Sequence, residues 1–130
     1  MDDASLDARN TYLRAVIDLS KRWARAVNLF HSIHVRDIHS ADLIVLLDEL
    51  RAIAGYAELL VVPPLDRGMH DTLVQALRAG VGYFVLIAEK QTFDAALLLE
   101  YERTLLLFSS AFNRVLDDIA EVLRRIAERN

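Results

Sequence analysis

The sequence predicts an all-α protein, an antiparallel up-down-up-down four-helix bundle that forms a single domain over residues 1–130. Three observations predict this fold. Four segments carry apolar residues at alternating spacings of three and four, which is typical of a helix that packs along another helix. The breaks between the segments are short, and short connections favour antiparallel neighbours. The chain has only 4 glycines and 2 prolines to interrupt helices, and no strand pattern competes.

The first helix is expected at about residues 4–34 and the second at about 41–62. In the first helix, one seam contains Leu13, Val16, Ser20, Trp23, Val27 and Phe30. Ser40 is expected to cap the second helix, with Asp42 in the first turn, where a negative charge complements the helix dipole. This helix is expected to end before Pro63, because proline disfavours helical geometry in the residue ahead of it.

The third helix is expected at about residues 66–90, with Asp66 as its cap, and the fourth at about 94–128, with Thr92 or Asp94 as its cap. The inner face of the third helix is expected to contain Met69, Leu73, Leu77, Gly80, Phe84 and Ile87. The seam of the fourth is the most regular in the chain and contains Leu98, Tyr101, Leu105, Phe108, Phe112, Val115, Ile119, Val122 and Ile126. Such a seam predicts near-parallel packing.

The predicted helices differ in length. At 1.5 Å per residue, a helix over 94–128 would be about 50 Å long and a helix over 41–62 about 33 Å long. The first and last helices are therefore expected to project beyond the other two and to pair with each other at their terminal ends.

Charge and cysteine content exclude several classes of function. The net charge is −4, and each half of the chain has two more acids than bases, so no strongly basic face is available to bind nucleic acid. The sequence contains no cysteine, which excludes thiolate zinc sites, disulfides and cysteine nucleophiles. The redox compartment stays undetermined.

No transmembrane segment is expected. The longest runs without charge, AGVGYFVLIA and TLLLFSSAFN, are far shorter than the roughly 20 residues that span a bilayer. The chain begins MDDASLDARN, which has no basic and apolar regions of a signal peptide. The expected location is therefore cytoplasmic for the chain as given, or outside the cytoplasm if an upstream signal has been removed.

Four apolar residues outside the helical seams are candidates for an interface: Val45, Val85, Leu99 and Leu106. They lie in or beside runs that are apolar most of the way round a helix, whereas a monomeric bundle needs one apolar stripe per helix. Contiguous exposed apolar patches tend to mark interfaces. These residues favour a homo-oligomer or a protein partner. The alternative is a set of isolated exposed leucines, which are common and carry no function.

Gly80 and Gly82 interrupt the third helix, at a cost of about 1 kcal/mol each relative to alanine. One explanation is close helix packing, in which Gly80 admits a bulky side chain such as Trp23 or Phe112. The alternative is a small internal pocket for an apolar ligand near Gly80, Trp23 and Phe84. Trp23, Gly80, Phe84 and Phe112 are therefore the candidate pocket residues.

Three of the four histidines lie in HSIHVRDIHS, residues 31–40. A di-iron bundle needs a Glu-x-x-His motif on each of two helices, and the sequence contains none. Covalent haem attachment needs a Cys-x-x-Cys-His motif, which a chain without cysteine lacks. We therefore expect no metal and no cofactor. His31 and His34 are expected in the last turns of the first helix, where they can meet unsatisfied carbonyls, and His39 in the loop.

The sequence does not predict an enzyme. It contains no Gly-rich phosphate loop, no nucleophile elbow and no Ser/His/Asp order. Acids that are adjacent in sequence, as at Asp48-Glu49 and Asp117-Asp118, point to different faces of a helix and form no evident acid–base pair.

Several positions together resemble those of small uncharacterised bacterial helical-bundle domains. The matching positions, within about residues 12–115, are Trp23, Arg36, Val62-Pro63, His70 and Tyr83-Phe84. The resemblance implies a helical bundle and a structural place for His70 near the start of the third helix, but no activity. Members of this family are often exported behind a signal or lipid anchor, which this sequence does not show.

The sequence as a whole predicts a non-enzymatic protein-interaction or assembly module, either a homo-oligomer or one subunit of a complex. The alternative is a bundle that senses or carries a small ligand in an internal apolar pocket.

Overall fold

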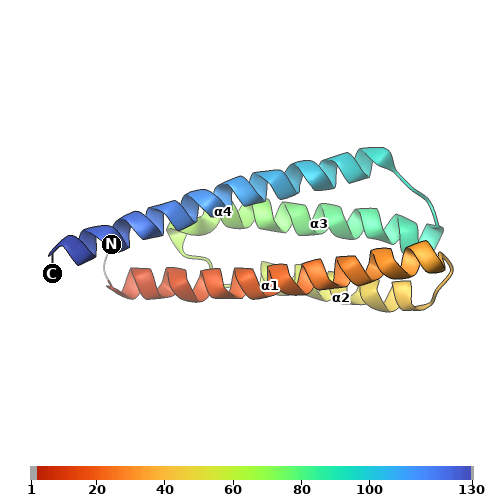
Figure 1. Cartoon of the computed structure of the whole chain (residues 1–130), viewed down its shortest axis with the longest axis horizontal. Coiled ribbons are helices and arrows are strands. Elements are labelled where there is room, and N and C mark those ends of the chain that lie inside the picture. The colour runs from red at the N-terminus through yellow and green to blue at the C-terminus, as the bar shows by residue number, and fades with distance from the viewer. Residues whose placement is uncertain (1–2, 130) are drawn as a thin grey trace.

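The computed structural model describes residues 3–129, which form an all-α four-helix bundle. Its elements are α1 (Asp3–Arg36), α2 (Asp42–Glu58), the 3-10 turn η1 (Pro64–Asp66), α3 (Arg67–Lys90) and α4 (Ala95–Arg129). Consecutive helices run in opposite directions, and α4 extends beyond the other helices at the end where both termini lie (Figure 1). No described residue lies in a strand, so the predicted fold class is confirmed.

The predicted helix boundaries are within two residues of the structure, except at the end of α2. This helix ends at Glu58, four residues before the predicted end at 62. Pro64 forces the preceding Pro63 into an extended conformation, with φ −59° and ψ 142°. Pro63 disfavours helical geometry in Val62 in the same way, so the chain leaves the helix earlier than the apolar pattern indicates.

Of the predicted caps, Asp94 is present and Asp66 is wrong, while Ser40 lies one residue before Ala41, the N-cap of α2. Asp94 Oδ1 accepts hydrogen bonds from the backbone N–H groups of Ala96 and Leu97, at 2.9 and 3.1 Å, which caps α4. Ser40 Oγ accepts a hydrogen bond from the backbone N–H of Asp42 at 3.2 Å. Asp66 makes no side-chain cap at α3; its carboxylate is buried and binds Arg9 instead.

The central helix of the bundle is α3, which packs against α2 and α4, while α1 packs against α2. In the described part of the chain, α1 and α4 do not pack closely along their length, so the predicted pairing of their ends is wrong. The fully buried face of α4 consists of Tyr101, Thr104, Ala111, Val115 and Ile119. Leu105 and Phe112, which were predicted in the same seam, are only half-buried.

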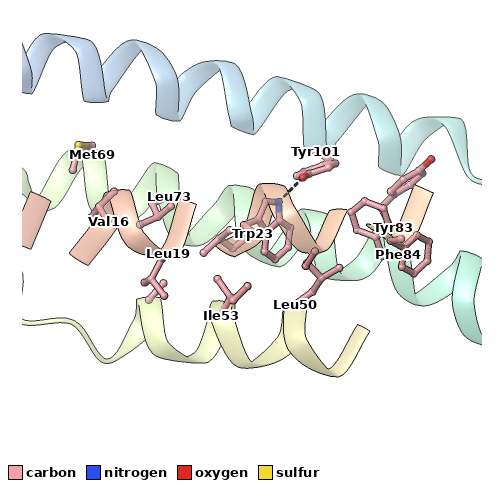
Figure 2. Close-up of a cluster of buried hydrophobic side chains, with 14 of the residues drawn as sticks. Val16, Leu19, Trp23, Leu50, Ile53, Met69, Leu73, Tyr83, Phe84 and Tyr101 are labelled. Atoms are coloured by element: carbon pink, nitrogen blue, oxygen red, sulfur yellow. Dashed lines mark hydrogen bonds between the residues drawn. The ribbon is translucent and has the colours of Figure 1, made fainter. Parts of the chain in front are cut away.

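A row of large side chains fills the centre of the bundle. Phe30, Leu47, Leu50, Ile53 and Phe84 are completely buried there. Trp23 reaches from α1 across the interior to Tyr101 on α4 (Figure 2). This one contact brings α1, α3 and α4 together, because Gly80 of α3 lies directly beside both rings.

One stretch in residues 3–129, Pro64–Lys90, is long and apolar enough to cross a membrane by length and composition alone. It consists of η1 and α3. Because α3 packs between α2 and α4, and nine of its residues are buried, its apolar composition is also that of the core helix of a bundle.

Candidate functional site

An apolar groove separates α1 from α4. Its deeper part has a volume of about 340 Å³. Ala24 and Val27 of α1 form one wall, and Leu105 and Phe108 of α4 form the other. Trp23 of α1 and Leu77 of α3 lie on the floor. The groove therefore lies where two neighbouring helices of a closed bundle would pack against each other.

A second hollow of about 310 Å³ continues the first toward the termini. It is lined by Ile17 and Lys21 of α1 and by Phe112 of α4, and it shares Ser20, Ala24 and Phe108 with the first. Because of these shared residues, the two hollows form one channel along the molecule, which we call the α1–α4 groove.

The side chains on the two walls explain why the groove stays open. On α1, Ser20 and Ala24 are small and fill little of the space between the helices. On α4, Phe108 and Phe112 lie side by side, with ring centroids 5.8 Å apart. Both rings are half-buried, so each presents one side to the core and the other to solvent. Small side chains on one helix that face aromatic rings on the other leave an open slot, because the side chains of the two helices do not interlock.

The floor of the groove is closed by polar and aromatic contacts. Trp23 Nε1 donates a hydrogen bond to the Tyr101 hydroxyl at 2.7 Å. Burial raises the pKa of Tyr101, although the hydrogen bond from Trp23 acts in the opposite direction. The phenol therefore stays protonated at neutral pH, and both polar atoms are satisfied within the floor.

Gly80 leaves no free space beside this contact. A Cβ atom at position 80 would lie 2.5 Å from Trp23 Cζ2 and 2.9 Å from Tyr101 Cε1. Trp23 therefore occupies the space that the glycine provides, which agrees with the explanation by close packing. Gly82 lies two residues farther along α3. A Cβ atom at this position would have no atom outside its own helix within 4 Å.

The four candidate pocket residues are not brought together at one site. Trp23 and Phe112 both line the groove, although in its two different hollows. Gly80 lies beneath the floor, against Trp23. Phe84 is completely buried and packs edge-on against Phe30, with ring centroids 4.8 Å apart, so it does not line the groove. The expected pocket around Phe84 is therefore wrong.

The four candidate interface residues also fall into separate places. Leu99 and Leu106 are 65% and 70% exposed on α4, seven residues apart, and Val45 is 65% exposed on α2. Val85 is half-buried and packs against the core, so its assignment to an uncovered surface is wrong. Because α2 and α4 do not pack against each other, Val45 is not part of the α4 surface.

A buried polar cluster, which the sequence did not predict, fixes the end of the bundle near the termini. Arg9 Nη2 donates to Asp66 Oδ1 at 2.7 Å, and both side chains are almost fully buried. Beside this pair, the Tyr12 hydroxyl and His70 Nδ1 are 2.8 Å apart. The only signal in the sequence that could have revealed it is the spacing of three residues from Arg9 to Tyr12 and of four from Asp66 to His70.

The pKa values in this cluster are set mainly by burial. Burial raises the pKa of Tyr12 far above its usual value, and nearby Asp66 adds to the effect. Burial lowers the pKa of His70, although Asp71 acts in the opposite direction. A neutral His70 can accept the hydrogen bond that Tyr12 donates. The cluster is therefore a satisfied structural network that ties α1 to the start of α3.

A hollow of about 580 Å³, larger than either hollow of the groove, lies beside this cluster. It is lined by Ala8, Thr11 and Tyr12 of α1, by residues 60–63 between α2 and η1, and by Pro64 of η1. The Tyr12 hydroxyl is already bound to His70, so the hollow has few polar groups to orient a ligand.

The histidine-rich segment has the predicted positions. His31 and His34 lie in the last turns of α1, and His39 lies in the loop, where the Gln91 side chain contacts His39 Nδ1 at 2.7 Å. No three side chains of the types that bind metals come together in the described part of the chain.

Comparisons with protein-family models, with curated proteins and with solved structures found no match for this chain.

Proposed function

We propose that this protein is a non-enzymatic interaction module that binds the apolar face of a protein partner in the α1–α4 groove. One observation carries the proposal: the side of the bundle between α1 and α4 is apolar, continuous and open, whereas the other neighbouring helices in the bundle are packed. Exposed apolar surfaces of this kind tend to mark interfaces.

The length of the groove favours a helix as the element that it binds. The part of α4 that lines the groove covers 12 residues, from Tyr101 to Phe112, and is about 16 Å long, which is three helical turns. An amphipathic helix presents anchors at spacings of three, four and seven residues, which match the spacing of side chains along such walls. The half-buried rings of Phe108 and Phe112 provide contact area for these anchors.

The polar groups around the groove support binding rather than catalysis. The side chains that line it include Ser20, Asn28 and Ser109, with Lys21 at its edge, but no carboxylate and no histidine. A hydroxyl without a neighbouring base is a weak nucleophile.

A small apolar ligand is the second candidate occupant, and the hollow beside Trp23 favours it. Its volume of about 340 Å³ is large enough for a small molecule. Trp23 and Tyr101 provide an aromatic floor, although their polar atoms are already paired with each other.

Energy transfer from Trp23 can test the proposal, because Trp23 is the only tryptophan in the chain and lies on the groove floor. The acceptor is a dansyl group on a synthetic amphipathic helix of leucine, glutamate and lysine. We expect saturable energy transfer, which Ala24→Arg abolishes by placing a charge inside the groove. Ala96→Arg is the matched control, because Ala96 is also an exposed helical alanine but lies outside the groove.

Transfer that is absent, or equal in the two variants, would refute the proposal. A free naphthalene-sulfonate dye separates the second candidate from the first. Saturable binding of the dye, together with no binding of the peptide, would favour a small ligand.

A further inference from the structure

We infer that the partner in the α1–α4 groove is a second copy of this chain, related by a two-fold axis parallel to the helices, so that α1 of each copy lies against α4 of the other. The inference rests on the proposed function of the groove. It is carried by the exposed area, the apolar stripe of α4 and the charges along the two edges of the groove.

The chain exposes more surface than a monomer of its mass needs. Its accessible surface is 7992 Å². The surface of a compact monomer of 14.7 kDa is about 6,900 Å² on the usual mass scaling. The excess of roughly 1,000 Å² is similar to the roughly 800 Å² that each partner buries in a protein–protein interface of standard size.

Part of this excess is an apolar stripe that continues the groove along α4. Leu116 and Leu123 lie four and eleven residues beyond Phe112, and they are 40% and 49% exposed. Leu106 adjoins the groove residue Leu105 and is 70% exposed. From Leu105 to Leu123 the stripe is about 27 Å long, which is the length of a helix–helix contact.

Charges of opposite sign lie along the two edges of the groove. Arg14 and Lys21, seven residues apart, share the outer edge on α1, and Lys21 lines the groove itself. Glu102 and Asp117 share the outer edge on α4 with Leu106, by the helical repeat. None of the four charged residues forms an ion pair within residues 3–129.

Other charges on α4 are paired within the helix. Glu121 pairs with Arg124 and Arg125, and Glu100 pairs with Arg103, all within the helix. Arg14, Lys21, Glu102 and Asp117 are therefore charges at the groove edges that a second copy could pair. Other exposed charges, such as Asp18 and Asp118, also form no ion pair within residues 3–129.

The signs of these charges select one arrangement of the two copies. An axis parallel to the helices places the basic α1 edge against the acidic α4 edge of the partner. An axis perpendicular to the helices would place each edge against its own copy, and like charges would repel. The positions of Arg14 and Asp117 along the bundle axis also agree. Ile17 and Phe112 line the same hollow. Arg14 lies about 4.5 Å from Ile17, and Asp117 lies about 7.5 Å from Phe112, both toward the end of the bundle where the termini lie.

Charge reversal tests this arrangement through the mass in solution, measured by light scattering after size-exclusion chromatography. We expect the wild type to be a dimer at high micromolar concentration. Arg14→Glu and Asp117→Arg, each alone, should raise the dimer dissociation constant about tenfold, because each places like charges together at two symmetric positions. An equimolar mixture of the two variants should recover dimers, because every contact in the mixed dimer then joins opposite charges.

Arg78→Glu is the control for net charge, because Arg78 is exposed and pairs with Glu58 at the α2–α3 contact. It should leave the dimer unchanged. Circular dichroism checks that the variants fold, which is expected because Arg14 and Asp117 are exposed. A monomeric wild type would overturn the inference, while binding of the synthetic helix would still support the groove. A dimer that the mixture does not recover would also overturn it, because α1 would then not face the partner's α4.

Discussion

Helix α1 meets α3 and α4 in opposite ways. Toward α3 it presents the buried pairs Arg9–Asp66 and Tyr12–His70, and farther along Trp23 fills the space beside Gly80. Toward α4 it presents small residues across an open groove, and Trp23 alone reaches over to Tyr101 by a hydrogen bond. One side of α1 is thus covered by buried polar pairs and close packing, and the side toward α4 is left uncovered.

The two sides of α1 therefore have different roles in this account: the buried contacts stabilise the fold, and the open groove binds a partner. Packing against α2 and the buried side-chain contacts with η1 and α3 hold the position of α1, so the side toward α4 does not have to close for the bundle to fold. A groove with rigid walls loses little conformational entropy when a partner binds. The following predictions test the two sides of α1 against each other.

The largest effect is expected at the buried ion pair. Arg9→Leu leaves the Asp66 carboxylate buried without its partner, which should lower the free energy of unfolding by about 3–5 kcal/mol. Urea denaturation measures the change. Arg114→Leu is the control, because Arg114 is exposed on α4, and it should stay within about 0.5 kcal/mol of the wild type. Equal effects of the two changes would show that the contact with α3 does not fix α1.

The next effect is expected at the two glycines of α3. Gly80→Ala should lower the free energy of unfolding by about 2 kcal/mol, because its Cβ atom would collide with Trp23 and Tyr101. Gly82→Ala meets nothing outside its helix and should raise it by up to about 1 kcal/mol, through helix propensity. Thermal denaturation should therefore move in opposite directions for the two variants. A shift in the same direction would contradict the close contact at Gly80.

The two sides of α4 should respond differently to added volume. Ala111 is buried against the core, so Ala111→Leu should cost about 1–2 kcal/mol through overpacking. Ser109 lines the open groove and is exposed, so Ser109→Leu should change the free energy of unfolding by less than about 0.5 kcal/mol. The comparison fails if the Ser109 variant is destabilised as strongly as the Ala111 variant in dilute solution.

The smallest effect is expected from acid. Because the pKa of His70 is lowered in the folded state, the unfolded chain binds a proton more readily, and stability should fall as the pH drops below about 6.5. The Tyr12 hydroxyl contacts His70, and the charges of Asp71 and Arg67 act on its pKa in opposite directions, so they affect the size of the change. His70→Gln should weaken this pH dependence, measured as the denaturation midpoint between neutral and mildly acidic pH. An unchanged pH profile would show that His70 is not the group responsible.

The sequence predicted the helices well because their signals are local. The Asp94 cap, the Ser40 hydrogen bond and the apolar spacings act within a few residues of each other, so the chain itself reveals them. Asp66 was misread because its partner, Arg9, is 57 residues away in sequence. The early end of α2 was missed because the apolar run at residues 59–62 continues the pattern of the helix, although the helix ends at Glu58.

The groove was harder to predict than the fold. The fourth helix has one unbroken apolar seam in the sequence, and nothing in it shows that Thr104 and Ala111 face the interior while Leu105 and Phe112 face an open slot. Periodicity identifies the apolar side of a helix. Which residues of that side pack against another helix depends on the volumes of side chains from several helices. Trp23 and Phe112 were identified by residue type, whereas Phe108 and Leu77 required the structure.

The most direct test of the account compares the mass of the wild type with that of Ala24→Arg and Ala96→Arg by sedimentation equilibrium. Ala24 lines the groove, and Ala96 is exposed outside it. If the open side of α1 is the binding surface, Ala24→Arg should be monomeric at concentrations where the wild type and Ala96→Arg are dimeric. An Ala24→Arg variant that keeps the dimeric mass of the wild type would contradict the account.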